Sequence, residues 1–479
     1  MTVTTSPSRT RRTLLAVLAV ATSLQAVGAA SAQSEMAKRI GSPEAPATDV
    51  PDGFTVAAVG DAICHFPISA VIKAKTPKMI DIIKGADLAV VNFETTTIDF
   101  DKYKGEPQAE AGGSWLVTRP GVPQDLADMG FDLVGRANNH STDWGVDGMK
   151  MTDEFLDKAG LVHAGTGKNL GAAAAPRYLE GRSFGRAAIV SFASSFEPMS
   201  PALNMLGEVP GRAGMNALHT TQIVQVSPEQ LATLGEVATA ATNRAPRTAG
   251  EVVMGETVFR ATPGLTKPIS TYTMNPADVL RISQNVRNGK LGANFEAVYM
   301  HAHQGGGNIA EPADFMPKIA HQAIDSGADA FFASGPHLVR GIEIYKGKPI
   351  FYSLGNFCHM DDPQQPQPQQ LYDQLGVDAN EVPLGDLMRY WVDTNFGRQE
   401  LLESVIAVSK FVGGNVSEIR LYPIQLGRDG RKQLRGLPLL ATPEQGKAVL
   451  ERIGKLSEPF GTKIVIENNV GVIRVGATR

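Results

Sequence analysis

The chain has 479 residues, of which 43% are hydrophobic and 20% are charged, a composition typical of a globular protein rather than a disordered one. Its 49 acidic residues outnumber its 45 lysines and arginines, giving a formal net charge of −4, whereas nucleic-acid-binding proteins need a basic surface. Its two cysteines, Cys64 and Cys358, exclude a dense disulfide framework but allow a single bridge outside the cytoplasm.

The amino terminus has the features of an export signal. Residues 9–12 contain three arginines, two of them adjacent, and an apolar run over residues 14–30 ends at a cleavage-like Ala-Ser-Ala triplet. A permanent membrane anchor is the alternative, but the run is short for a membrane span. We therefore expect residues 1–32 to be a twin-arginine signal peptide and residues 33–52 to be a linker. The mature protein would be periplasmic or extracellular.

From residue 53 onward, short apolar runs rich in β-formers alternate with segments of helical periodicity. The core strands that we predict are residues 54–59, 88–91, 133–134, 188–192, 297–300, 329–333 and 349–354. The predicted helices are residues 124–129, 147–159 and 315–326. This alternation predicts an α/β fold built in layers, within one domain that spans residues 53–479.

Two stretches interrupt the alternation. Residues 196–285 show no clear strand–helix pattern, so we predict an insertion there. Residues 361–371 are rich in Pro and Gln and predict a loop of low complexity. A carboxyl-terminal extension follows at residues 380–479. Its predicted elements are strands at residues 403–412, 416–426 and 463–466 and a helix at residues 443–456.

Side chains of the kinds that bind metals follow directly after several predicted strands. Each one alone has an ordinary explanation as a turn or helix-cap residue. Together they suggest a site, because the ligand site of an open α/β sheet lies beyond the carboxyl ends of its strands. Their carboxylate, amide and imidazole groups suit Mn, Zn or Fe. The residues are Asp61, Glu94, Asn139, His140, His303 and His337.

Several short strings occur in a characteristic order along the chain. They are Gly60-Asp61, Asn92-Phe93-Glu94, the string Ala-Asn-Asn-His-Ser-Thr-Asp-Trp-Gly at residues 137–145, His303-Gln304-Gly305, Gly335-Pro336-His337 and Tyr-Ser-Leu-Gly-Asn-Phe at residues 352–357. This order resembles the CapA family, named for poly-γ-glutamate capsule proteins. The resemblance implies a core like that of the calcineurin-like metallophosphoesterases, a layered β-sandwich flanked by helices.

The resemblance also implies a role for each residue of the site. Asp61 and His337 would bind one divalent ion, and Glu94 would take the place of the bridging carboxylate. Asn139 and His303 would bind a second ion. His140 would then serve as the proton donor or as the stabiliser of a developing oxyanion.

This sequence departs from the metallophosphoesterase pattern at two ligand positions. Ile63 stands where the first strand has a histidine, and Gly335 stands where the last motif has its first histidine. Either the site holds one ion, or another histidine substitutes. His301 is two residues from His303, so on a strand both would face the same side. The candidates for substitution are His65, His301 and His359.

Two functions remain open at this point. The first is metal-assisted hydrolysis of a phosphoester or of an amide such as a γ-glutamyl bond, with His140 held by Asp143 as the proton donor. The second is a non-catalytic accessory role in capsule synthesis or export, in which the protein binds an anionic polymer. The expected partners are a small-molecule or polymeric substrate and, peripherally, a membrane or the capsule machinery. No nucleophile elbow or phosphate-binding glycine loop occurs in the sequence.

The two cysteines share one local pattern, since each is followed by a histidine and stands just beyond a predicted core strand. If the strand ends converge, Cys64 and Cys358 should be close in space. The alternatives are a disulfide between the first and the last loop of the site, or two separate buried thiols.

Overall fold

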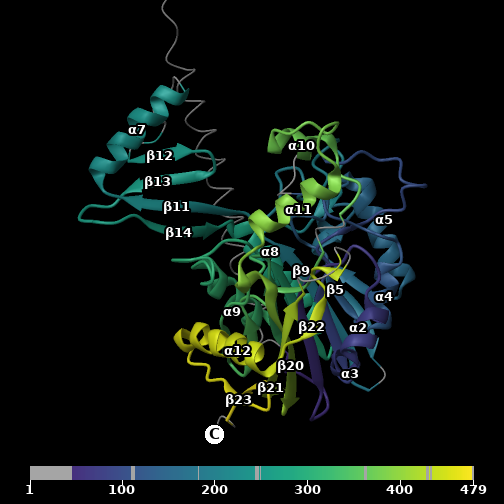
Figure 1. The fold of residues 1–479 in the computed structure, drawn as a ribbon. Helices are drawn as coiled ribbons and strands as arrows, with labels where there is room; N and C mark the ends of the chain where they lie inside the picture. The colour runs from purple at the N-terminus through teal and green to yellow at the C-terminus, as the bar shows by residue number, and fades with distance from the viewer. Residues whose placement is uncertain are drawn as a thin grey trace, which may run out of the picture. The chain divides into compact units, whose positions relative to one another are not determined.

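The fold is described from a computed structural model (Figure 1), which describes residues 46–476 except 109–113, 182, 243–247, 249, 361–363, 428–430 and 432–433. The chain divides into two compact units, Met1–Pro46 and Ala47–Arg479, and every element named below belongs to the second. The predicted signal peptide lies outside the described residues.

The first of the two main sheets has ten strands and is mixed. Along its main path the order is β23-β24-β21-β20-β1-β2-β5-β6, while β19 also pairs with β1 and β22 with β21. The carboxyl-terminal extension is thus part of the main sheet, because β20 pairs antiparallel with β1. The strands are β1 Thr55–Ile63, β2 Leu88–Asn92, β5 Leu133–Gly135, β6 Val162–Ala164, β19 Asn356–His359, β20 Glu403–Val412, β21 Asn415–Leu426, β22 Pro438–Leu440, β23 Val465–Glu467 and β24 Val470–Arg474.

The second main sheet has six strands in the order β17-β18-β16-β15-β9-β8. Its central strands β9, β15 and β16 are parallel, so their carboxyl ends lie at one edge. The strands are β8 Arg177–Gly181, β9 Gly185–Ala193, β15 Phe295–His301, β16 Ala330–Ser334, β17 Ile342–Tyr345 and β18 Lys348–Phe351.

The main hydrophobic core lies between these two sheets. Alternate residues of β1 face opposite ways: Val56 and Ala58 belong to the cluster that also contains Tyr299 of β15, whereas Ala57 and Val59 pack on the outer side. Both faces of the central strands are therefore buried, which explains why they appear in the sequence as short continuous apolar runs.

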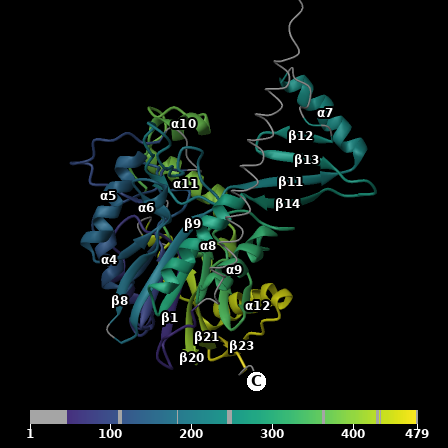
Figure 2. The same ribbon diagram turned by 180° about the vertical axis from the view of Figure 1, so that it is seen from behind.

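Helices cover the outer face of each sheet, and Figure 2 shows α8 and α9 on the side of the six-stranded sheet. The layers are thus helix, sheet, sheet and helix, as the family resemblance implied. The helices that pack on the first sheet are α2 Ser69–Lys75, α3 Pro77–Lys84, α4 Val122–Asp128 and α5 Gly145–Lys158. Those on the second are α8 Pro276–Leu291 and α9 Phe315–Ser326. Helix α12, Pro443–Ser457, contributes Val449, Leu450 and Ile453 to the core between the sheets.

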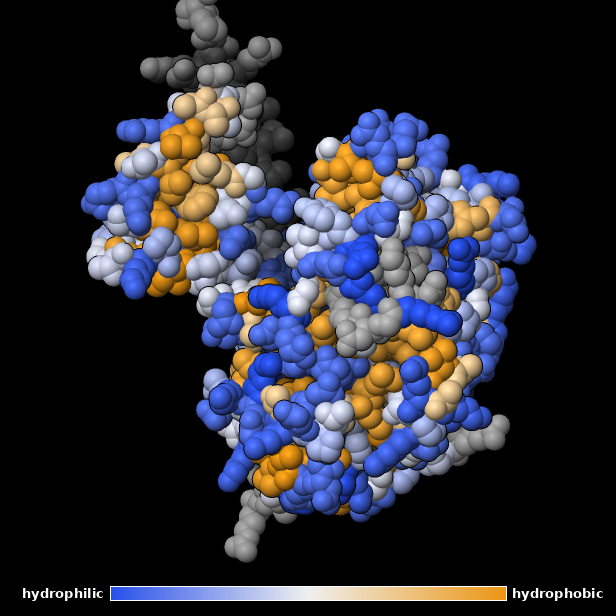
Figure 3. All heavy atoms as spheres, in the orientation of Figure 1, coloured by the Kyte–Doolittle hydropathy of each residue, from blue (hydrophilic) through white to orange (hydrophobic). Residues whose placement is uncertain are grey.

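The segment 196–285 has more regular structure than its sequence suggested. It contains a four-stranded sheet in the order β12-β13-β11-β14, with apolar residues of α7 packed on one face, and it ends in α8 of the main body. Figure 3 shows hydrophobic residues gathered over α7 and its neighbouring strands. The elements are β11 Thr220–Val226, α7 Pro228–Thr242, β12 Glu251–Met254, β13 Thr257–Ala261 and β14 Ile269–Met274.

The Pro- and Gln-rich segment leads into a small helical cap. Residues 364–368 have no regular secondary structure, and two helices follow that pack on a cluster containing Ile98, Trp115 and Trp144. The helices are α10 Gln369–Leu375 and α11 Leu384–Asn395. The remaining short elements are β3 Thr96–Thr97, β4 Val117–Thr118, β7 Thr166–Gly167, α6 Leu170–Ala174, β10 Gly214–Met215 and the 3-10 turns Gln399–Leu402 and Glu458–Phe460. Among the described helices, none has the length and apolar character that a membrane span requires.

Strands β1 and β19 run parallel and place the two cysteines side by side. Asp61 pairs with Asn356 in the register. A Cβ atom at Gly60 would lie 1.7 Å from the carbonyl oxygen of Gly355, so this close approach requires glycine. Three residues after Asp61 and two residues after Asn356, the structure joins Cys64 and Cys358 in a buried disulfide with a Cα–Cα distance of 5.8 Å.

Candidate metal centre

The site is formed where the two main sheets present the carboxyl ends of their parallel strands. Asp61 near the end of β1 is in register with Asn92, the last residue of β2, and Glu94 follows two residues later. From the other sheet, His301 is the last residue of β15. Asp61, Glu94 and His301 are fully buried, so the fold itself concentrates charged and imidazole groups away from water.

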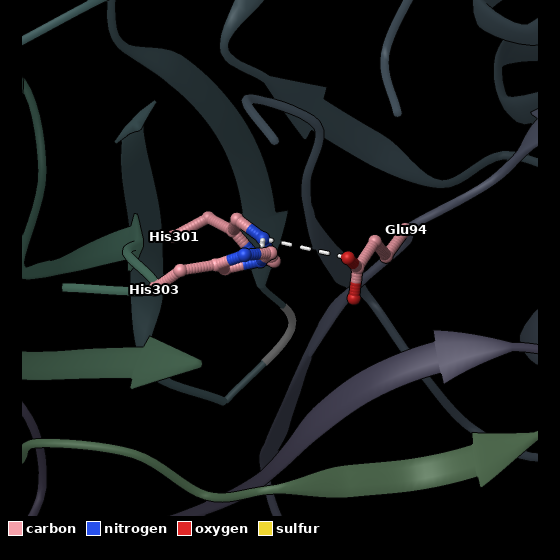
Figure 4. A group of neighbouring side chains, drawn as sticks. All are labelled: Glu94, His301 and His303. Atoms are coloured by element: carbon pink, nitrogen blue, oxygen red, sulfur yellow. Dashed lines mark hydrogen bonds and ion pairs between the residues drawn. The ribbon is translucent and has the colours of Figure 1, made fainter. Parts of the chain in front are cut away.

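One group of potential ligands consists of Glu94, His301 and His303, each of which offers one atom within 4.8 Å of the others (Figure 4). Nε2 of His301 lies 3.4 Å from Oε1 of Glu94 and 3.0 Å from Nε2 of His303. Two imidazole nitrogens that face each other beside a carboxylate form an arrangement that suits a divalent cation.

A second group consists of Asp61, Glu94 and His337, again with one atom from each within 4.8 Å of the others. Glu94 belongs to both groups. The family resemblance assigned it the place of the bridging carboxylate. Nδ1 of His337 lies 3.9 Å from Oδ2 of Asp61. His337 adopts a positive φ of 58°, rare for a residue with a side chain, and the turn that carries it is thus tightly constrained.

Asn139 is a buried amide in the loop that also carries Asn138 and His140. It is only 4% exposed, and its Oδ1 atom has no hydrogen-bond partner among the residues that the structure describes. A buried acceptor without a partner costs about 1–3 kcal/mol, and coordination of a cation would remove that cost. Its neighbour Asn138 donates from Nδ2 to the carbonyl of Phe93, which ties this loop to the residue preceding Glu94.

The electrostatics of the site favour an ionised Asp61 and neutral His303 and His337. Burial alone would raise the pKa of Asp61, but the hydrogen bond to His301 and the charges of His301 and His337 lower it overall. Burial, followed by the neighbouring His301 and His337, lowers the pKa of His303 well below its usual value. Burial and then His359 lower the pKa of His337 to about 4. At neutral pH both imidazoles are therefore uncharged and have a lone pair available for a metal ion.

His140 stands beside the shared carboxylate. Its Nδ1 atom lies 2.7 Å from Oδ2 of Asp143, and its Nε2 atom lies 3.9 Å from Oε1 of Glu94. The backbone amide of Leu116 also donates to Oδ2 of Asp143, at 2.7 Å. Burial raises the pKa of Asp143, although the charge of His140 opposes that rise. The pair thus directs one ring nitrogen of His140 toward the potential ligands.

Of the three candidate substitutes, His301 lies within the first group of ligands. Nδ1 of His65 is 2.8 Å from the carbonyl of Val117, and in the described part of the chain His65 belongs to neither group. His359 also lies outside both groups. Its ring packs instead against Phe396 and against His337, with centroid distances of 4.3 Å and 5.2 Å.

Several residues that support the potential ligands had no assigned role in the sequence. Asn92 donates from Nδ2 to Asp61 at 2.6 Å, and Oδ1 of Asn356 lies 2.8 Å from Nδ1 of His337. The hydroxyl of Ser195 accepts from the amide of His303 at 2.8 Å. Asn92 and Asn356 lie within the short sequence strings that resemble the CapA family, and this position could have identified them. No such string contains Ser195. Such supporting contacts orient metal ligands and set their basicity.

The chain is similar in sequence to several known proteins. An uncharacterised protein, y4sH, of Sinorhizobium fredii is 42% identical over 442 residues, which cover 90% of this chain and 95% of that protein. The capsule biosynthesis protein CapA of Bacillus anthracis is 24% identical over 275 residues, covering 57% of this chain and 51% of that protein.

A solved phosphatase from Mycoplasma pneumoniae aligns over 78% of this chain and 87% of its own, with 11% identity and a TM-score of 0.31. Residues 55–360 match the family described as bacterial capsule synthesis protein PGA_cap. That match covers more than half of the chain and all of the potential ligands described above. The chain therefore belongs to the PGA_cap family of bacterial capsule synthesis proteins.

Proposed function

We propose that this protein is an exported, metal-dependent hydrolase that cleaves a phosphoester bond or an amide bond of the γ-glutamyl type. The observation that carries the proposal is the position of Glu94. This carboxylate is common to both groups of potential ligands, and Nε2 of His140 lies 3.9 Å away from it. A structural ion pair would not need three imidazoles and an oriented histidine around a single carboxylate.

The residues that would hold one or two divalent ions are those of the two groups, with Asn139 as an additional oxygen ligand. They are Asp61, Glu94, Asn139, His301, His303 and His337. Mn, Zn and Fe are the ions that suit this mixture of oxygen and nitrogen donors. Such an ion polarises the scissile bond and lowers the pKa of a bound water.

The protein's own contribution to the reaction is to hold and deliver a proton. The carboxylate of Asp143 can only accept, so Nδ1 of His140 carries the proton of their 2.7 Å hydrogen bond. The remaining nitrogen, Nε2, faces the ligand groups and would protonate the leaving group when the ring is charged. Asp143 stabilises that charged ring, and the surrounding burial strengthens their interaction.

The competing proposal is a non-catalytic accessory protein of capsule synthesis that binds an anionic polymer. The departures at Ile63 and Gly335 favoured it, because they remove two histidines from the metallophosphoesterase pattern. The place of His301 weakens that argument, since this residue brings an additional imidazole to within 3.4 Å of Glu94. Export is supported by the signal-like amino terminus and by the Cys64–Cys358 disulfide, which is a feature of oxidising compartments.

The test is hydrolysis by the purified protein before and after removal of its metal. Generic phosphodiesters and γ-glutamyl amides should be offered in parallel, and activity should disappear with a chelator and return with Mn, Zn or Fe. Turnover that is insensitive to chelation would contradict the proposed chemistry. A protein that binds metal at full occupancy but hydrolyses neither substrate class would support the accessory role instead.

A further inference from the structure

Three consecutive backbone amides of the segment that enters β4 are bound by side chains from distant parts of the chain. The amide of Trp115 donates to Oε1 of Gln367 at 3.1 Å, and the amide of Val117 donates to Oε1 of Gln364 at 2.7 Å. Between them, the amide of Leu116 donates to Oδ2 of Asp143 at 2.7 Å. The two glutamines therefore hold one edge of this segment. On the other edge, the amide of Leu116 binds Asp143, the hydrogen-bond partner of His140.

Gln367 binds both the amide and the carbonyl of Trp115, whereas Gln364 links the amide of Val117 to the carbonyl of Met360. Each uses both ends of its amide: Nε2 of Gln367 donates to the carbonyl of Trp115 at 2.7 Å, and Nε2 of Gln364 donates to the carbonyl of Met360 at 3.1 Å. The side chain of Gln364 belongs to a residue that is 0% exposed. Buried amides that are satisfied in this way fix the position of the backbone they bind.

This arrangement gives a role to the Pro- and Gln-rich segment, which the proposed reaction leaves unexplained. Its glutamines differ in environment: Gln364 is buried and Gln367 is half-buried, whereas Gln365 and Gln369 are exposed. Composition alone does not distinguish these glutamines. Among the described residues of this segment, Gln364 and Gln367 are the glutamines that bind residues 115–117, which support Asp143. The carbonyl of Leu116 is held from a different side, by the indole N–H of Trp144 at 3.1 Å.

We propose that Gln364 and Gln367 are positioning residues for the His140–Asp143 pair. They hold residues 115–117 so that the amide of Leu116 fixes Oδ2 of Asp143, and Asp143 in turn fixes the imidazole of His140. The inference rests on the proposed function only for the effect on turnover. The effect on the hydrogen bond between His140 and Asp143 can be measured without any substrate.

The experiment compares Gln364→Met/Gln367→Met with the matched control Gln365→Met/Gln369→Met. Methionine has nearly the same length as glutamine but cannot bind the backbone at either end. We expect the first variant to keep its metal content and KM while kcat falls about 10- to 100-fold, the range found when outer-shell partners are removed. The control should match the wild type in all three quantities.

The second readout is the ring Nδ1–H resonance of His140 in protein labelled with 15N-histidine. This proton should be protected and shifted downfield in the wild type and in the control, and its signal should be lost in Gln364→Met/Gln367→Met. If that variant does not fold, Gln367→Met alone, at the half-buried position, should weaken the resonance. An unchanged Nδ1–H signal together with unchanged kcat would overturn the inference. A wild-type protein without turnover would contradict the proposed function, while the resonance would still decide whether the glutamines position the pair.

Discussion

Nδ1 of His140 lies 2.7 Å from Oδ2 of Asp143, and both residues are buried. The other ring nitrogen of His140, Nε2, lies 3.9 Å from Oε1 of Glu94, the carboxylate common to the two groups of potential ligands. A buried pair of this kind holds the imidazole in one tautomer and one orientation. The structure thus separates the residues that would bind a metal from the residue that would move a proton, and the two can be tested independently.

Replacement of the proton donor should affect turnover and leave metal binding intact. We expect His140→Ala to retain the metal content of the wild type and to lose about a hundredfold or more of kcat, because general acid catalysis contributes about that much. Steady-state kinetics together with elemental analysis provide the measurement. His321→Ala is the matched control, since His321 pairs with Glu343 and stacks on Tyr345. Undiminished kcat in His140→Ala would rule out its role as proton donor.

Replacement of a ligand should have the opposite signature. We expect His303→Ala and His337→Ala each to lower the metal content of the purified protein, because each removes one imidazole from a different group. His65→Ala serves as the control, since its ring is bound to the carbonyl of Val117 and lies outside both groups. Full metal occupancy in both ligand variants would show that the ions bind elsewhere.

Glu296 should make folding stability depend on pH. This residue of β15 is fully buried, and its carboxylate oxygens have no hydrogen-bond partner within the described structure. Burial, and then the charge of Asp329, raise the pKa of Glu296 well above its usual value, although Lys290 opposes the rise. The folded state therefore binds a proton that the unfolded state releases, so stability falls as the pH rises above the unfolded-state pKa.

Glu296→Gln should remove this dependence. At pH 8 the variant should be more stable than the wild type, because each pH unit between the unfolded-state and folded-state pKa of Glu296 costs the wild type about 1.4 kcal/mol and costs the variant nothing. The difference should shrink toward pH 4, where the unfolded carboxyl also becomes protonated. Urea unfolding at both pH values measures it, with the exposed Glu236→Gln as the control. A variant that is less stable than the wild type at pH 8 would contradict this account.

The disulfide should contribute to stability and to the geometry of the site. Cys64 and Cys358 are separated by 294 residues, and cross-links that close long loops stabilise typically by about 2–4 kcal/mol. We expect Cys64→Ala/Cys358→Ala to unfold at lower denaturant concentration than the oxidised wild type. The wild type treated with a thiol reductant after partial unfolding should behave like the variant. Equal stability of the oxidised wild type and the variant would show that the bridge contributes nothing.

The sequence predicted the core better than the insertion, for a physical reason. In the core, both faces of the strands are buried, so β1 and β15 are short apolar runs, and the predicted helix at residues 315–326 is confirmed as α9. In the insertion only one face of the small sheet is covered by α7, so polar residues stand among the apolar ones of β11, and in β12 Val252 is buried under α7 whereas Val253 is exposed. That weaker pattern did not stand out from the surrounding loops.

The sequence predicted the contacts that follow from the position of a residue at the end of a strand. It did not predict the contacts that depend on the direction in which a side chain points. The register of β1, β2 and β19 brings Asp61, Asn92 and Asn356 together, so ligand-type residues after strands indicated where the site lies. Whether His65, His301 or His359 would join them stayed open, because only the direction of each ring decides it. The contacts of Gln364 and Gln367 were invisible for the same reason, since neighbouring glutamines of the same segment face solvent.

The most direct test of the central claim is anomalous X-ray scattering from crystals of the metal-loaded protein, recorded at the absorption edge of the bound metal. The account predicts one or two anomalous peaks beside the carboxylate of Glu94. A peak should lie near His301 and His303, near Asp61 and His337, or at both places, and His140 should be close to it. Peaks at another place in a protein that contains stoichiometric metal, with Glu94 left without an ion, would contradict it.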